Sequence, residues 1–75
     1  MKVMLKTHEV KRELARRNIS QNGLAIKLGI TSGYCSQLLA GVRCPSPALR
    51  SKLMGELRLP FETLFSFAEP SSANQ

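Results

Sequence analysis

The stretch from Gln21 to Gly41, QNGLAIKLGITSGYCSQLLAG, decides the fold of this chain of 75 residues. It predicts two short helices with a turn of about three residues between them, and a turn of that length makes the helices cross steeply. Ala25 supplies the small side chain that a close crossing needs, and Gly29 supplies a positive φ in the turn. The space between the two helices is expected to be filled by apolar side chains, namely Leu24, Leu28, Ile30, Cys35 and Leu38.

The segments on either side also have helical patterns. Thr7 is a candidate N-cap for a helix that buries Val10 and Leu14. Ser46-Pro47 is a helix start, because a capping serine is followed by proline at the first helical position. That helix carries an apolar stripe at Leu49, Leu53 and Leu57, and a last short helix begins at Leu59-Pro60 with Phe61, Leu64 and Phe65 apolar. The prediction is an all-α, compact five-helix domain with no credible sheet.

Both ends of the chain differ from this helical part. Val3 and Leu5 alternate with lysines in residues 1–6, which is typical of an extended arm or a short strand. Six residues cannot form a stable sheet alone, so the arm would need a partner to become ordered. We expect an N-terminal arm at 1–6, a helical domain at 7–67 and a flexible C-terminal tail at 68–75.

The charge of the chain favours polyanionic partners. Eleven basic and five acidic residues give a net charge of +6. No acidic residue lies between Ser20 and Met54, where a carboxylate would repel phosphate. Nucleic acid is the first candidate partner and an anionic membrane the second. A basic surface that only keeps the protein solvated is the alternative.

Several other classes of protein are disfavoured. The chain has no Asp, one His and no paired nucleophile and base, so we expect no enzyme. Its two cysteines lack metal-ligand spacing, and we expect no metal, no cofactor and no small-molecule ligand. No signal peptide is apparent, and the longest uncharged run, from Leu28 to Val42, is too short to span a bilayer. We therefore expect a cytoplasmic protein.

The motif resembles the lambda-repressor/Cro-like helix-turn-helix family of DNA-binding domains, from about Val10 to Phe65. The residues that match the family pattern in register are Gln21, Leu24-Ala25, Leu28-Gly29, Ile30 and Gly41. Four positions depart from it. Gly23 stands where a glutamate often completes a capping box, and Arg58 stands where glycine is frequent. Cys35 replaces a branched residue at the buried pivot, and Gly33 stands where a side chain that reads DNA is common.

The resemblance implies which residues contact DNA. The outward face of the second motif helix would enter the major groove, and a glutamine such as Gln37 suits adenine. The ordinary reading of the same face is a polar, solvated surface. Tyr34 either contacts a phosphate, sugar or thymine methyl, or shields the core. Gln21 and Arg43 are expected at the DNA backbone. The expected DNA-binding residues are Gln21, Thr31, Ser32, Gly33, Tyr34, Ser36, Gln37 and Arg43.

The function that follows is sequence-specific binding of double-stranded DNA by a transcriptional regulator, with repression as the default. The alternative is an antitoxin-like or mobile-element accessory protein that acts mainly through a protein partner. One recognition helix reads too few base pairs to specify a site, so we expect a weak homodimer through the Phe-rich C-terminal helix, Phe61 to Phe67.

Overall fold

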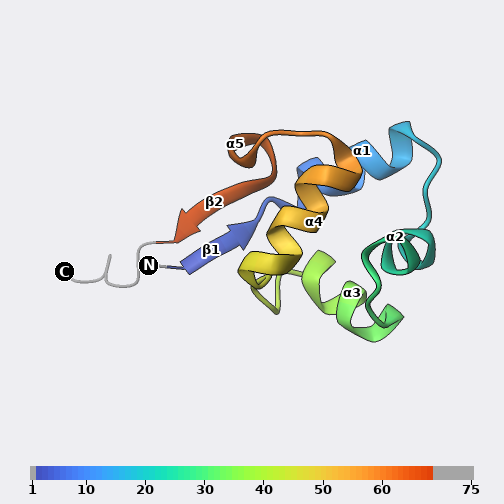
Figure 1. Cartoon of the computed structure of the whole chain (residues 1–75), viewed down its shortest axis with the longest axis horizontal. Helices are drawn as coiled ribbons and strands as arrows, with labels where there is room; N and C mark the ends of the chain where they lie inside the picture. The colour runs from blue at the N-terminus through green and yellow to red at the C-terminus, as the bar shows by residue number, and fades with distance from the viewer. Residues whose placement is uncertain (1, 69–75) are drawn as a thin grey trace.

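The fold is a rounded body of helices from which two short strands extend (Figure 1). The computed structural model describes residues 2–68. The elements in chain order are β1 (Lys2–Leu5), α1 (Thr7–Arg16), α2 (Gln21–Leu28), α3 (Ser32–Leu39), α4 (Pro47–Leu57), α5 (Phe61–Leu64) and β2 (Phe65–Ala68). The mostly helical architecture is as predicted, but the prediction that no sheet forms is wrong.

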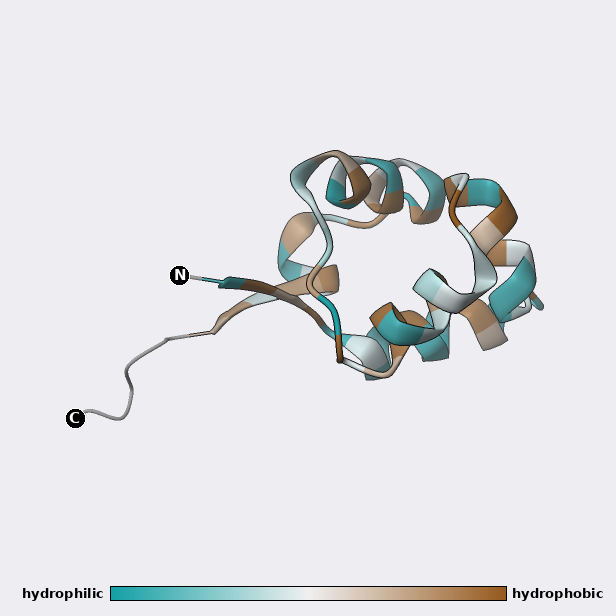
Figure 2. Cartoon of the chain, turned by 90° about the horizontal axis from the view of Figure 1, so that it is seen from below, coloured by the Kyte–Doolittle hydropathy of each residue, from teal (hydrophilic) through white to brown (hydrophobic). Residues whose placement is uncertain are grey.

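The sheet pairs the two ends of the described chain. Strands β1 and β2 are antiparallel, with Val3 opposite Phe67 and Leu5 opposite Phe65. Directly opposite residues share a face, so these four side chains form one apolar face of the sheet. Seen from below, the strand pair projects from the helices and carries mainly hydrophobic residues (Figure 2). The arm therefore finds its ordering partner within the same chain.

The predicted last helix is shorter than expected, because the residues that follow Leu64 form strand β2. Helix α5 ends at Leu64, and Phe65 has extended backbone angles. Phe65, Ser66 and Phe67 alternate with the period of a strand rather than that of a helix. Ala68 ends β2, and the rest of the expected tail, 69–75, lies outside the described residues.

Side-chain caps define the starts of three helices. Ser20 accepts a hydrogen bond from the Gly23 amide at 2.9 Å, and Ser46 accepts one from the Leu49 amide at 3.2 Å. Thr31 caps α3 in the same way. Ser20 thus caps α2 although Gly23 cannot return the second bond of a capping box. The N-cap predicted at Thr7 is wrong, because Thr7 is the first helical residue and Lys6 precedes it without a side-chain cap.

The core is a single cluster of apolar side chains contributed by every helix and both strands. The predicted apolar stripe on α4 is buried. The apolar side chains predicted to lie between α2 and α3 are buried too, except for that of Ile30 in the turn, which is half-buried. The buried hydrophobic residues are Leu5, Val10, Leu14, Leu24, Ala25, Leu28, Cys35, Leu38, Leu39, Leu49, Leu53, Leu57, Leu64 and Phe65. This core holds α2 and α3 at a defined mutual position.

A charged cluster ties the end of α1 to the end of α4. Glu13 is buried and forms ion pairs with Arg16 and Arg17. Arg17 also donates to the carbonyl oxygens of Glu56 and Leu57. These hydrogen bonds satisfy backbone carbonyls that the end of a helix leaves free. Arg16 and Arg17 are therefore both engaged in contacts within the fold.

Candidate nucleic-acid interface

Helices α2 and α3 pack against each other around the turn at Gly29 (Figure 1). Gly29 has φ 71° and ψ 32°, the left-handed conformation that glycine adopts without strain. The Ile30 amide donates to the Ala25 carbonyl at 3.0 Å, which closes the end of α2. The turn predicted from the sequence is confirmed, and it sets α3 on the surface of the body.

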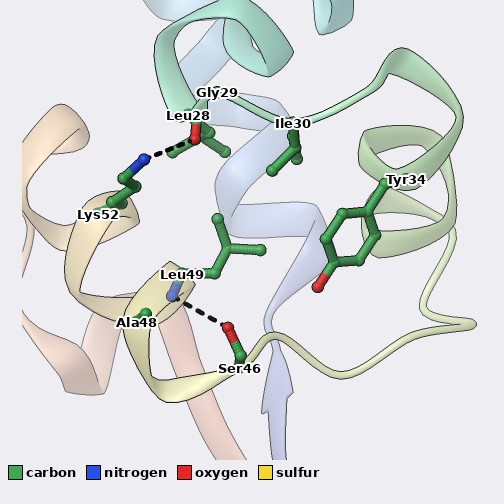
Figure 3. A pocket seen from close by; sticks show the side chains of 8 residues that line it. All are labelled: Leu28, Gly29, Ile30, Tyr34, Ser46, Ala48, Leu49 and Lys52. Atoms are coloured by element: carbon green, nitrogen blue, oxygen red, sulfur yellow. Dashed lines mark hydrogen bonds between the residues drawn. The ribbon is translucent and has the colours of Figure 1, made fainter.

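Lys52, on α4, contacts the end of α2 beside this turn. Its Nζ donates to the Leu28 carbonyl oxygen at 3.1 Å, at the C-terminal end of α2 (Figure 3). A cation is favourable there, because the helix dipole is negative at that end. A side chain at Gly29 would place its Cβ 3.4 Å from the same Nζ. Lys52 thus connects α4 to the end of α2, a contact that its place in the sequence did not indicate.

Helix α3 has one buried and one exposed face. Cys35, Leu38 and Leu39 are buried. The opposite face is exposed and carries the predicted contact residues Ser32, Gly33, Ser36 and Gln37. Its side chains are short or polar and uncharged, so they can approach base edges without the cost of desolvating a charge.

The N-terminal end of α2 lies beside the middle of α3. The Cys35 thiol donates to the Gln21 carbonyl oxygen at 3.6 Å, and burial raises the pKa of this thiol, which keeps it protonated. Gln21 is exposed at the first position of α2. Thr31 is exposed as well, but its hydroxyl already accepts a hydrogen bond from the Tyr34 amide at 3.1 Å. Gln21 is thus packed through its backbone against Cys35 on the buried side of α3, and Thr31 lies at the N-terminal end of α3.

Arg43 reaches back from the loop after α3 to the predicted contact face. Its Nη1 donates to Gln37 Oε1 at 3.2 Å. The guanidinium carbon also lies 4.9 Å from the centroid of the Tyr34 ring, a cation–π distance. Tyr34, Gln37 and Arg43 therefore form one connected cluster, which we call the Arg43 cluster. Sequence reasoning selected all three residues but did not predict that they contact one another.

The charges of the described chain are distributed unevenly around this face. The acidic residues lie on α1, α4 and α5, namely Glu9, Glu13, Glu56 and Glu62. Helices α2 and α3 and the loop that follows carry Lys27 and Arg43 and no carboxylate. This surface would attract phosphate rather than repel it.

A small hollow separates the motif from the start of α4 (Figure 3). Its volume is about 200 Å³, and the Tyr34 side chain extends from α3 across it toward Ser46. Pockets that hold small molecules typically measure about 300–1,000 Å³. The hollow is lined by Leu28, Gly29, Ile30, Tyr34, Ser46, Ala48, Leu49 and Lys52. Most of these residues build the turn and the helix cap, so the hollow belongs to the architecture of the motif.

Residues 2–68 contain no group of three or more His, Cys, Asp or Glu side chains that could hold a metal ion. No helix in that range has the length and apolar character needed to cross a membrane. Cys35 is buried and Cys44 is exposed, and both are free thiols.

Comparison with known families agrees with this geometry. The helix-turn-helix family model matches residues 10–64, most of the chain. The chain therefore belongs to the lambda-repressor/Cro-like helix-turn-helix family, whose domains bind DNA in regulators of transcription. Neither the curated proteins nor the solved structures yielded a match.

Proposed function

We propose that this protein binds specific sequences of double-stranded DNA in the cytoplasm and represses transcription by occupying them. The observation that carries the proposal is the exposed uncharged polar face of α3, set by the Gly29 turn in a region without carboxylates. An α-helix fits the major groove, where each base pair presents a distinct pattern of donors and acceptors.

In this proposal α3 lies in the groove and its exposed face contacts base edges. Gln37 is the longest side chain on that face and contacts a base directly. Ser32 and Ser36 donate or accept at base edges or phosphates. Gly33 has no side chain, and a Cβ built there has no neighbour within 4 Å, so the backbone can approach the DNA closely.

The flanking residues position α3 through the DNA backbone. Gln21 lies at the N-terminal end of α2, where the helix dipole and the first-turn amides favour a phosphate. Thr31 and Tyr34 are placed to contact sugar or phosphate at the edge of the groove. Such contacts set the register of the protein without reading sequence.

We also propose that two copies bind together as a weak homodimer through the C-terminal segment. Phe65 is part of the core, but 55% of Phe67 remains exposed at the projecting end of the sheet. The Phe67 ring lies 5.5 Å from that of Phe61, which is half-buried. An exposed aromatic side chain beside other apolar groups is typical of a contact surface. Two-fold pairing doubles the length of DNA that is read.

Selection of bound duplexes from a random pool tests the function. The wild-type protein should enrich a palindromic consensus, and Gln37→Ala should lose the preference at one base pair of each half-site. Ser51→Ala, which removes an exposed serine from α4, is the matched control and should keep the full consensus. A selected pool that does not differ from the starting pool would contradict sequence-specific binding.

A further inference from the structure

The Arg43 cluster determines which way the amide group of Gln37 points. Arg43 Nη1 lies 3.2 Å from one terminal atom of the Gln37 amide. A guanidinium has five N–H donors and no acceptor, so the Gln37 atom facing it must be the carbonyl oxygen. The NH₂ group of Gln37 is then left to face away from Arg43, with two donors available.

The ring of Tyr34 limits the movement of the guanidinium. The Arg43 guanidinium carbon lies 4.9 Å from the ring centroid, and Tyr34 is itself half-buried in the body. Arginine stacks on aromatic faces and loses little further freedom when it then forms a hydrogen bond. Arg43 is therefore held in place to bond Gln37 before any DNA is bound.

This arrangement changes what the Gln37 side chain can recognise. A free glutamine suits adenine, because its oxygen accepts from the adenine N6 amine while its nitrogen donates to N7. In the Arg43 cluster one of the two lone pairs of that oxygen accepts from a cation, whose other N–H donors lie beside it. An adenine amine bonded to the second lone pair would bring its own donors next to those of the guanidinium. The edge that Gln37 and Arg43 present together consists mainly of donors.

We propose that Gln37 and Arg43 act as one unit that reads guanine, in which Arg43 both contacts the base and converts Gln37 from adenine to guanine preference. This inference rests on the proposed function. Guanine presents two acceptors in the major groove, N7 and O6, whereas adenine presents one acceptor and one donor. The Gln37 NH₂ donates to one guanine acceptor, and a remaining N–H of Arg43 donates to the other.

The test is a binding titration on a panel of duplexes derived from the selected consensus. The base pair read by Gln37 is identified as the one at which Gln37→Ala loses preference, and all four base pairs are placed there. The wild-type protein should prefer G·C over A·T by about 5- to 150-fold, the range of one good bidentate pair. In Arg43→Ala the Gln37 oxygen is free, and this ratio should fall at least fivefold, toward A·T.

Two variants serve as controls. Arg12→Ala removes an equal charge from an exposed position on α1 and should leave the ratio of G·C to A·T unchanged. Tyr34→Phe keeps the ring beneath Arg43 and should keep the ratio, because the hydroxyl that it removes is proposed to contact only the DNA backbone, which carries no sequence information. Because Gln37 and Arg43 act as a unit, the double variant should lose less preference than the sum of the losses in the two single variants.

The outcomes that overturn the inference are distinct from failure of the proposed function. A wild-type preference for A·T at that position would overturn it. So would an Arg43→Ala protein that binds all four duplexes more weakly but with an unchanged ratio of G·C to A·T, since Arg43 would then be a phosphate contact only. A wild-type protein that binds no duplex with sequence preference would overturn the proposed function and the inference with it.

Discussion

Glu13 forms the ion pairs that hold Arg16 and Arg17 at the end of α1. It is the only charged residue that is buried in the described part of the chain, and it bonds Arg16 and Arg17. The hydrogen bond from Arg17 and the positive charges of both arginines hold the pKa of the Glu13 carboxyl below its ordinary value of 4.5. The same Arg17 binds the last carbonyls of α4, so the carboxylate supports a contact between two helices.

Glu13 should therefore make the stability of the fold depend on pH. A lowered pKa in the folded state means that the contribution is fully present above pH 4.5 and is lost as the pH falls through the folded-state value. Glu13→Gln should lower the melting temperature at pH 7, and the difference from wild type should shrink as the pH falls toward 3. Glu9→Gln, at an exposed position of the same helix, is the control. A difference for Glu13→Gln that is equal at both pH values would contradict this account.

The residue that ends α4 has a strained backbone conformation. Arg58 follows the helix with φ 54° and ψ 44°, a left-handed conformation that is strained for a residue with a Cβ. The sequence comparison with the family already indicated that glycine is frequent here. The structure shows that the turn keeps the glycine-like backbone although the side chain is an arginine.

Arg58→Gly should stabilise the fold by about 0.5–1 kcal/mol, because relief of the left-handed strain exceeds the extra entropy of glycine in the unfolded chain. Chemical denaturation measures the change. Arg12→Gly, which places glycine inside α1, is the matched control and should destabilise by about the same amount. Loss of stability in Arg58→Gly would show that the arginine side chain supports the turn.

Elements with strong local signals could be predicted from the sequence. The cap at Ser46 and the turn at Gly29 depend on residues close in the chain, and the structure has them as expected. The β1–β2 pair was missed because its two strands are separated by the whole helical body. The alternation of Val3 and Leu5 did indicate an extended arm or a short strand at the N-terminal end. A four-residue strand has little local signal, and the alternation of Phe65, Ser66 and Phe67 could have indicated the second strand.

The same distinction applies to the candidate site. Periodicity predicted which side of α3 is exposed, since the buried positions recur at helical spacing. The bond between Gln37 and Arg43 was not predictable, because it depends on the path of the loop after α3. The binding roles of all the predicted contact residues stay predictions.

Acidic residues are unevenly placed over the described part of the molecule. Between residues 2 and 68 they lie on α1, α4 and α5, whereas α2, α3 and the following loop have none. A dimer that meets about eight to ten phosphates should show a slope on the order of −7 to −9 in a plot of log affinity against log salt concentration. Titrations of the consensus duplex at several salt concentrations measure the slope. A nearly flat response would show that the basic surface does not meet phosphate.

The proposed dimer has its contact at the exposed end of the sheet. Burial of one Phe side chain contributes roughly 1.5–3 kcal/mol, so Phe67→Ser should weaken self-association by at least about tenfold. Analytical ultracentrifugation over a range of concentrations, with and without the consensus duplex, measures this. Ile26→Ser removes another exposed apolar side chain, from α2, and should leave self-association unchanged. A wild-type protein that is monomeric at every concentration and binds one copy per duplex would contradict the dimer.

The central claim is that α3 and its immediate neighbours form the DNA-binding surface. An NMR titration of the isotope-labelled protein with the consensus duplex tests it at every backbone amide. The account predicts that the largest shift changes fall at Gln21, across residues 31–37 and at Arg43, while α1 and α5 change little. Shift changes concentrated on α1 and α5, with α3 unaffected, would contradict it.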